Sequence, residues 1–402
     1  MNDEGYRIII EDSAKSVFAD PTQKLLLTAA LGDGEAAIAA WREWSNGGNL
    51  DRMDAGSFRL LPLLHSNLQR LGVTGPDVAL LKGVRRRAWY QSQMLLRELM
   101  PIVQGWTEEG IPVTILKGPA VAQLHYQDLS VRPVVDVDAM IPKEYVRPLA
   151  ERLLDAGWQA LTWTPRVISD AYLDYRHAIG LKAPSGAEID LHWHAFYHCC
   201  NDEVDAALLK RSVPLDLMGV RVRAFDPTDQ LIHSCIQGMV NEGAATIRWI
   251  PDSVTIIRSA RIDWDRLVRL AIDTDSTLIF GTALKYLKSE FACDVPSDAI
   301  LKLESAVVTR SERVELQRAL WPDEALGITD TIRAVFWRHQ RTGSASGPLG
   351  RLRFLRHVQY QWQADSLTAI ARSLSYWLQR RLSLLRNGGE GALDSKRLSA
   401  NG

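Results

Sequence analysis

The sequence predicts an α+β protein in which a small mixed sheet, flanked by helices, lies between helical additions at both ends. In residues 135–141, acids alternate with Val and Ala inside an apolar run, as in a strand that buries one face. Residues 143–156 carry apolar side chains at helical spacing and end before a glycine. Residues 178–194 are typical of a β-hairpin with its turn at 184–186. Together these segments give the strand-helix-strand order of an α/β core.

The length of the chain, 402 residues, favours two or three units rather than one core. We interpret residues 1–100 as a helical N-terminal region, 101–225 as the core and 226–341 as a helical domain. Residues 342–402 contain a Gly/Ser-rich linker, a basic amphipathic pair of helices and a disordered tail. No apolar run reaches the ~18 residues of a transmembrane span.

Composition is that of an ordinary soluble protein, with 46% hydrophobic and 24% charged residues. A formal net charge of -1 gives the whole chain no attraction to nucleic acid or anionic membranes. The four cysteines include the adjacent pair Cys199-Cys200 but no Cys-x-x-Cys motif, and the N-terminus lacks the features of a signal peptide. A reducing, cytoplasmic location is therefore expected.

Three carboxylates are the candidate catalytic and metal-binding groups. Asp136 and Asp138 are two residues apart on one strand, about 6.6 Å along it, so their side chains point the same way. Asp190 shares a strand face with Glu188 and His192 in the later hairpin, which we expect to pair with the Asp136 strand. Carboxylates this close need neutralising, and Mg²⁺ suits their hard oxygens. Two such ions, about 3.5–4 Å apart, serve phosphoryl or nucleotidyl transfer.

Candidate phosphate-binding residues precede the carboxylates. Lys117 can meet a triphosphate as a point charge, Arg132 can do so with two nitrogens, and Gly118 lets the backbone come close. The simpler alternative is that Gly118 only makes a turn and that the two cations balance neighbouring acids. His192 is interpreted as a partner of the Asp190 carboxylate or as a phosphate contact.

Two other chemistries are weaker. His192, His194 and the Cys199-Cys200 pair invite a zinc site, but no distal pair of ligands completes a tetrahedron with recognisable spacing. His194 is interpreted instead as a surface or interface residue. Ser185 lies in the hairpin turn without a Gly-x-Ser-x-Gly elbow, so acyl transfer is not supported.

Several short motifs follow one another along the core. They are Leu116-Lys117-Gly118, Tyr126, Arg132, Asp136-Val137-Asp138 and Ile189-Asp190-Leu191-His192-Trp193. In these motifs the chain resembles a branch of largely uncharacterised bacterial nucleotidyltransferases in the DNA polymerase β-like nucleotidyltransferase superfamily. The resemblance extends from about Leu60 to about Pro296. The chain departs from the wider superfamily in one respect. The superfamily has Gly-Ser or Gly-Gly before the Asp-x-Asp motif, whereas here Pro119 follows Gly118 and the gap to Asp136 is long.

The resemblance implies a polymerase β-like core that transfers a nucleoside monophosphate from a nucleoside triphosphate to a hydroxyl-bearing acceptor. It also implies that Asp136 and Asp138 bind two Mg²⁺ ions, with Mn²⁺ as a substitute, and that Asp190 is both ligand and base. The acceptor stays open among small molecules, sugars, peptides and proteins, including a tailoring step in a biosynthetic pathway. Kinase-like phosphoryl transfer by the same ions, or a non-catalytic nucleotide-binding module, are the alternatives.

The basic segment 351–386 interleaves seven arginines with Leu, Trp and Tyr. Its simplest interpretation is a helical hairpin whose apolar side covers the core. The alternatives are docking on a membrane surface, on nucleic acid or on another subunit.

Overall fold

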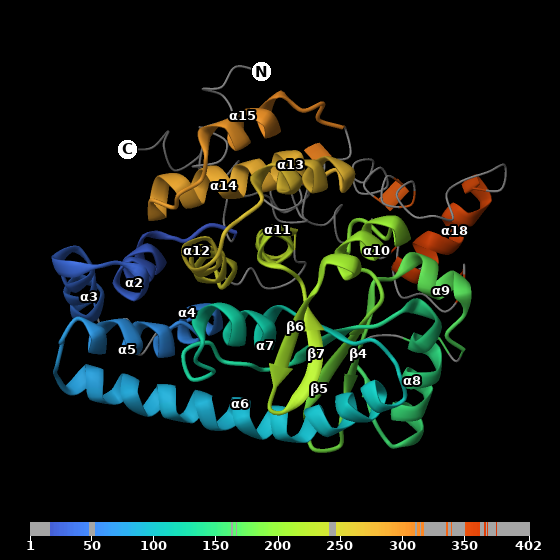
Figure 1. The fold of residues 1–402 in the computed structure, drawn as a ribbon, viewed down its shortest axis with the longest axis horizontal. Coiled ribbons are helices and arrows are strands. Elements are labelled where there is room, and N and C mark those ends of the chain that lie inside the picture. The colour runs from blue at the N-terminus through green and yellow to red at the C-terminus, as the bar shows by residue number, and fades with distance from the viewer. Residues whose placement is uncertain are drawn as a thin grey trace, which may run out of the picture.

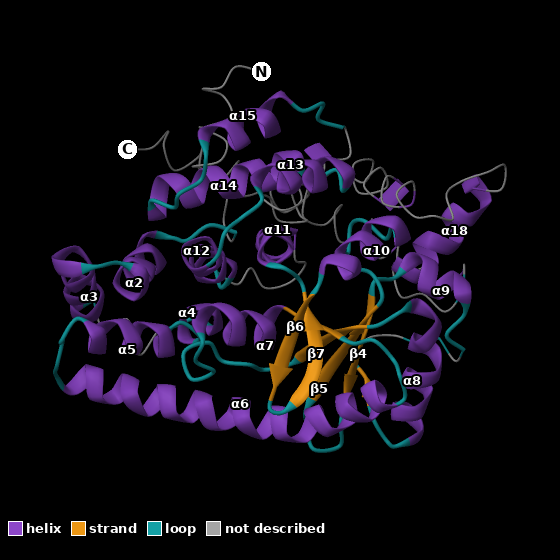
Figure 2. Ribbon diagram, in the orientation of Figure 1, coloured by secondary structure: helices purple, strands orange, loops and turns teal. Residues whose placement is uncertain are grey.

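The computed structural model describes residues 17–47, 53–161, 164–165, 167–240, 247–309 and 350–361, with a few single positions between 312 and 375. The predicted linker, the tail and most of the basic segment lie outside these residues. The described chain folds into a mixed sheet surrounded by helices, which confirms the predicted fold class (Figures 1 and 2).

The sheet has seven strands in the order β3-β4-β5-β2-β1-β7-β6. The pairs β2–β5 and β1–β7 are parallel and the other neighbours are antiparallel. The predicted hairpin is β4–β5, and its neighbour is β2, as expected. The strands are β1 (Thr114–Leu116), β2 (Val137–Met140), β3 (Gln159–Ala160), β4 (Ala178–Lys182), β5 (Glu188–His192), β6 (Val213–Leu217) and β7 (Val220–Ala224).

Helices cover both faces of the sheet, and the longest, α6, runs beneath the N-terminal helices and the sheet alike (Figure 1). Residues 100 and 101, between which the sequence suggests a division, both lie within α6, and the division into domains stays a prediction. The helices are α2 (Pro21–Leu31), α3 (Gly34–Asn46), α4 (Ala55–Phe58), α5 (Leu61–Arg70), α6 (Pro76–Glu108), α7 (Lys117–Val121), η2 (Ala122–Tyr126), α8 (Lys143–Asp155), α9 (Asp170–Tyr175), α10 (Asp202–Arg211), α11 (Pro227–Val240), α12 (Trp249–Ser259), α13 (Trp264–Asp273), α14 (Thr277–Phe291), α15 (Ser297–Ser305) and α18 (Gly350–Gln361).

Alternation along the strands divides the interior into two hydrophobic layers. Val137 and Ile189 belong to the layer that β2 and β5 share with α6 and α8. Leu116 and Met140 belong to the other layer, which contains the helices from α11 to α15 and the N-terminal helices. Asp138 lies between Val137 and Ala139, both of the first layer, and therefore faces α11 and α12. The polar face of the sheet is thus covered by a helical layer rather than by bulk solvent.

From the sequence alone, Thr228 is a candidate N-cap for a helix from Leu231 to Val240, but the start of α11 differs. The helix begins at Pro227, and the Asp226 carboxylate accepts the backbone N–H of Asp229 at 3.0 Å. Thr228 Oγ1 instead accepts the backbone N–H of Asp263 at 3.0 Å, because a hydroxyl inside the first turn is free to bond a neighbouring segment. Thr228 therefore joins α11 to the start of α13.

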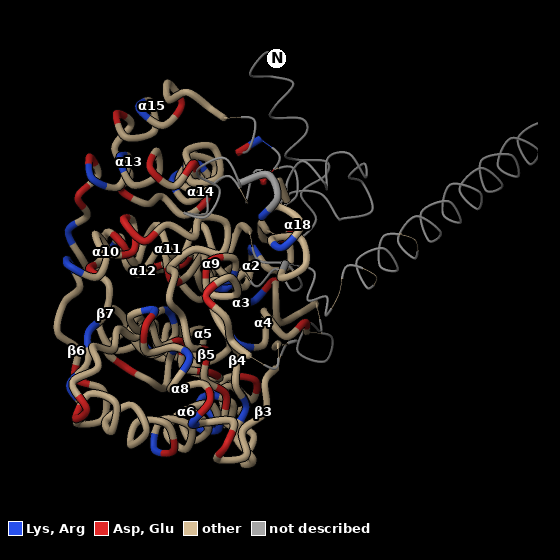
Figure 3. Tube along the Cα trace, turned by 90° about the vertical axis from the view of Figure 1, so that its right-hand side faces the viewer, with Lys and Arg blue, Asp and Glu red and all other residues tan. Residues whose placement is uncertain are grey.

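Basic and acidic residues are interspersed along the described chain (Figure 3). Arg85 in the Arg85–Arg87 run forms a salt bridge with Asp128 at 2.7 Å.

Within the basic segment, α18 packs on α9, where the ring centroids of Tyr172 and Tyr360 are 5.8 Å apart. This contact agrees with the interpretation of a helix that covers the core, and the docking alternatives stay predictions. None of the helices that the structure describes combines the length and apolar character needed to cross a membrane.

We expect Gly238→Ala in α11 to destabilise the protein by about 1–3 kcal/mol, since a Cβ there would lie 2.2 Å from Cγ of the buried Trp249. The control is Gly105→Ala in α6, where a Cβ meets nothing within 4 Å and should add about 0.5–1 kcal/mol of stability. Urea unfolding of the three proteins measures both effects. Equal stability of the two variants would contradict this account of the α11–α12 contact.

Candidate active site

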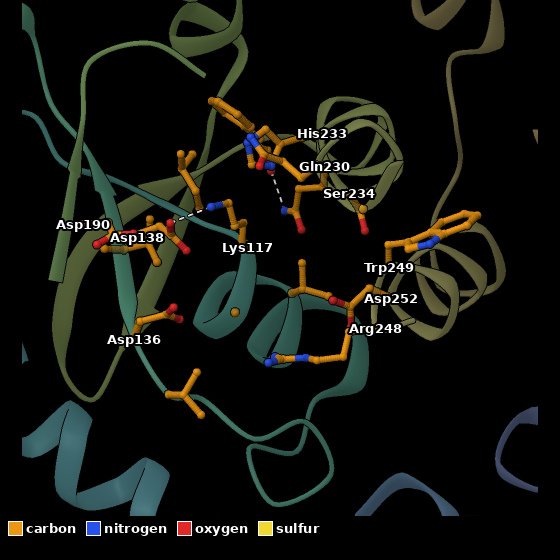
Figure 4. A pocket seen from close by; sticks show the side chains of 18 of the residues that line it. Lys117, Asp136, Asp138, Asp190, Gln230, His233, Ser234, Arg248, Trp249 and Asp252 are labelled. Atoms are coloured by element: carbon orange, nitrogen blue, oxygen red, sulfur yellow. Dashed lines mark hydrogen bonds and ion pairs between the residues drawn. The ribbon is translucent and has the colours of Figure 1, made fainter. Parts of the chain in front are cut away.

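The strand register brings the predicted carboxylates together. Asp138 on β2 and Asp190 on β5 are direct neighbours across the parallel pair, and Leu116 at the end of β1 lies opposite Asp138 on the other side. Lys117 follows Leu116 at once, so its side chain reaches the same place. Asp136 lies one residue before β2 and lines the same cavity (Figure 4). Three adjacent strands therefore deliver the four residues to one end of the sheet face.

A divalent cation fits the donor atoms at this place. Asp138, Asp190 and His192 each offer a ligand atom, and these atoms all lie within 4.8 Å of one another. Two carboxylate oxygens and one imidazole nitrogen suit Mg²⁺ or Mn²⁺ in combination with water and phosphate oxygens. Asp136 faces the cavity but is not part of this group of three. The assignment of Asp136, Asp138 and Asp190 together as metal ligands stays a prediction, with His192 as a further donor at the same place.

Asp138 is held in its charged form although it is only 2% exposed. Its Oδ1 accepts a hydrogen bond from Lys117 Nζ at 2.7 Å and lies 2.9 Å from His192 Nε2. Burial favours the neutral acid, but the ammonium and the imidazole outweigh burial and keep the pKa of Asp138 well below its usual value. Burial likewise opposes the Lys117 charge, and Asp138 outweighs it, so the pKa of Lys117 is raised. Lys117 is therefore the counter-ion of Asp138, as the simpler interpretation of this lysine expects.

The other two aspartates resist ionisation. Burial, with the negative charge of Asp138 as the next cause, raises the pKa of Asp190 to about 6. The same two causes, in the same order, raise the pKa of Asp136. The three carboxylates therefore differ in how readily they ionise, with Asp138 the most acidic. An added cation would favour the ionised form of all three.

Arg132 is fixed by a residue from the helical layer. Its Nε lies 3.0 and 3.1 Å from the two carboxylate oxygens of Asp252, and its Nη2 is 2.7 Å from Oδ2. Tyr126 donates its hydroxyl to the same carboxylate at 3.1 Å. The remaining nitrogen, Nη1, is buried without a hydrogen-bond partner and lies 3.1 Å from where a Cβ on Gly118 would stand. Gly118 thus leaves room for a guanidinium with one donor still available.

These side chains line a cavity of about 490 Å³ between the sheet and the helices α11 and α12 (Figure 4). Two further arginines, Arg59 and Arg248, line it and were not predicted from the sequence. Arg248 donates to the carbonyl of Pro133 at 3.1 Å and forms no salt bridge within the described residues. Burial and then the charge of Arg132 lower the pKa of Arg248 to about 10. In the sequence, only the family resemblance, which covers the segment around Arg248, could have pointed to this residue.

The remaining histidines near the cavity are neutral. Burial is the main cause that lowers the pKa of His177 well below its usual value and that of His233 to about 3. The expectation that His194 lies at the surface was wrong, because its side chain is 1% exposed. Its Nδ1 lies 2.6 Å from Oδ2 of Asp205 in the first turns of α10. The four cysteines are buried, and none joins either candidate metal group found among the described residues.

Asp190→Asn should raise the free energy of unfolding of the metal-free protein at pH 8 by about 1–3 kcal/mol, because a pKa of about 6 makes the ionised carboxylate costly to bury. A raised pKa means that the wild-type side chain is best tolerated below its unfolded value of 3.8 and loses stability as pH rises through about 6. The gain should therefore shrink between pH 8 and pH 5.

Urea unfolding in EDTA at the two pH values measures this gain. Asp273→Asn, at an exposed position late in α13, is the matched control and should change little at either pH. A pH-independent gain, or a less stable Asp190→Asn protein at pH 8, would contradict the assigned burial cost.

Comparison with known proteins agrees with the motifs. The family described as uncharacterised nucleotidyltransferase matches residues 55–292, close to the range over which the motifs suggested a resemblance. Among solved structures, the crystal structure of an antigenic nucleotidyltransferase-like protein from Paracoccidioides brasiliensis matches with 16% sequence identity and a TM-score of 0.34. That match covers 55% of this chain and 96% of the other. No curated protein is a significant match.

The family match covers more than half of the 402 residues and includes Asp136, Asp138, Asp190 and every cavity-lining residue described above. It begins at the first residue of α4 and ends one residue beyond α14, so it contains the whole sheet together with the helices that close the cavity. The chain belongs to the uncharacterised nucleotidyltransferase family.

Proposed function

We propose that the protein is a Mg²⁺-dependent nucleotidyltransferase that moves a nucleoside monophosphate from a nucleoside triphosphate to a hydroxyl-bearing acceptor. One observation carries the proposal: Asp138 and Asp190 are direct neighbours in register and share a cavity with Asp136 and with four basic side chains, those of Arg59, Lys117, Arg132 and Arg248. At about 490 Å³ the cavity is within the size range of small-molecule sites. Family membership supports the same reaction class.

In this proposal Asp136, Asp138 and Asp190 hold the ions, with His192 at Asp138 as a further ligand or as the group that orients it. Bound Mg²⁺ would supply neutralisation of the charge that develops on the transferred phosphoryl group. The free Nη1 of Arg132 and the Lys117 ammonium would bind triphosphate oxygens. Gly118 contributes by letting Arg132 come close, rather than by a special backbone conformation.

Asp190 is the proposed base toward the acceptor. A carboxyl with a pKa of about 6 is ionised at neutral pH and is a stronger base than an ordinary aspartate. It would orient or deprotonate the acceptor hydroxyl, whether that hydroxyl belongs to a small molecule, a sugar, a peptide or a protein. A tailoring step in a biosynthetic pathway and a cytoplasmic location both stay predictions from the sequence.

Asp138→Asn is expected to lower turnover by about 100-fold or more while leaving the fold intact, because catalysis here rests on positioned charge. The assay is mass spectrometry of a metabolite and peptide extract incubated with Mg²⁺ and each of ATP, GTP, CTP and UTP. Wild-type protein should add the mass of a nucleoside monophosphate to one component. Asp273→Asn should behave as wild type.

Each other outcome of that assay points elsewhere. Full turnover by Asp138→Asn would contradict the assigned site. Addition of a single phosphate would favour the kinase-like alternative. If the assay gives no product and calorimetry shows nucleotide binding that is independent of Mg²⁺, a non-catalytic nucleotide-binding module is favoured.

Arg248→Met should weaken binding of Mg²⁺-ATP about 10-fold or more, since a partly buried guanidinium without a salt bridge among the described residues is suited to a phosphate oxygen. Isothermal titration calorimetry measures the affinity without knowledge of the acceptor. The matched control is Arg269→Met on the exposed side of α13, which should bind as wild type does. Unchanged affinity of the Arg248 variant would remove this residue from the proposed phosphate site.

A further inference from the structure

A row of residues crosses the sheet at the level of the proposed metal ligands. Gly180 on β4 is the direct neighbour of Asp190 on β5, and Asp190 is the direct neighbour of Asp138 on β2. Directly opposed residues point to the same face of a sheet. The backbone of Gly180 therefore borders the carboxylate of Asp190 on the side away from Asp138.

A side chain at position 180 would occupy the place of the Asp190 carboxylate. A Cβ built on Gly180 would lie 2.8 Å from Asp190 Oδ1, 3.1 Å from Leu161 Cδ1 and 3.4 Å from Leu161 Cβ. Real Cβ atoms essentially never approach another heavy atom to 2.8 Å, so a substitution must displace the carboxylate or the strand. Asp190 thus lies over bare backbone, with Leu161 closing the space from the other side.

Backbone conformation does not explain the glycine. Gly180 does not have a positive φ, and it lies in the middle of β4 with regular pairing to β5. A glycine inside a strand weakens the strand and often marks a place where another group approaches closely. Here the approaching group is a carboxylate. Leu161 is fixed in turn, since its backbone N–H donates to the carbonyl of Gly180 at 2.8 Å.

We propose that Gly180 is a positioning residue, whose missing side chain sets where the Asp190 carboxylate lies relative to Asp138, and that Leu161 supports Asp190 from outside. The inference rests on the proposed function, in which these two aspartates bind a divalent cation. A ligand that is moved by a fraction of an ångström or more no longer matches the position of its partner ligands. Groups that orient metal ligands typically change affinity 10- to 100-fold when altered.

The test uses the full chain and Mn²⁺ alone as probe, with binding measured by the electron paramagnetic resonance signal of free Mn²⁺. Gly180→Ala should weaken Mn²⁺ binding by about 10-fold or more. Gly105→Ala, which adds the same methyl group far from any neighbour, should bind as wild type. Leu161→Ala removes a 44% exposed side chain, so folding is not at stake, and should weaken binding by less.

A double-mutant cycle separates positioning from general damage to the strand. In an Asp190→Asn background, Gly180→Ala should cause no further loss of Mn²⁺ affinity, because the carboxylate it displaces is already gone. A further loss of the full size would mean that the strand itself is disturbed, and would overturn the proposal. So would unchanged Mn²⁺ binding by Gly180→Ala. If Gly180→Ala does not fold, Leu161→Ala decides: weaker binding supports the proposal and unchanged binding overturns it.

Asp138→Asn and Asp190→Asn identify which idea has failed. If both bind Mn²⁺ as wild type does, the proposed metal site itself is wrong. If both lose affinity while Gly180→Ala does not, the metal site stands and only the role of Gly180 is refuted.

Discussion

The constraint on which the site depends is the cost of placing three carboxylates on one covered face of a sheet. Asp138 is ionised because Lys117 and His192 contact it directly, while the pKa of Asp190 beside it is raised to about 6. Like charges at neighbouring positions of a strand pair destabilise a fold unless something compensates them. Keeping all three is therefore costly for stability, and the compensation comes from cations brought in by other elements.

One of those cations also ties two parts of the molecule together. Arg132 lies in the segment that leads into β2, and Asp252 lies 120 residues later in the first turn of α12. Both side chains are more than 90% buried, and breaking a buried pair by removing one partner leaves an uncompensated charge. Because Asp252 accepts from Nε and Nη2, one edge of the guanidinium, it leaves Nη1 free. The contact that joins α12 to the β2 segment therefore also leaves a donor for the cavity that Arg132 lines.

Local patterns were enough to predict the parts of the site that lie on strands. The alternation in β2 and β5 placed Asp138 and Asp190 on one face, and the short turn of the hairpin placed β5 beside β2. Other features depend on distant contacts. Packing against the sheet and the N-terminal helices keeps α6 continuous through Pro101 and across the boundary suggested at residue 100. The β6–β7 hairpin was not predicted, although Val220 to Ala224 alternates clearly. Arg59 and Arg248 carry no local signal, since an arginine is assigned to a cavity only once the chain has folded.

The charge of the cavity itself argues for bound cations. Its lining residues include five acids and four Lys or Arg side chains, and the neighbouring histidines His177 and His233 are neutral at pH 7. A triphosphate brings several further negative charges into this partly buried space, where charges interact more strongly than in water. Arg59 and Arg248 alone cannot balance them, because Asp252 and Asp138 already offset Arg132 and Lys117. In the proposed function, divalent ions on Asp138 and Asp190 would neutralise the carboxylates and the phosphates at once. The excess of acid that destabilises the free protein would then favour binding of a metal-nucleotide complex.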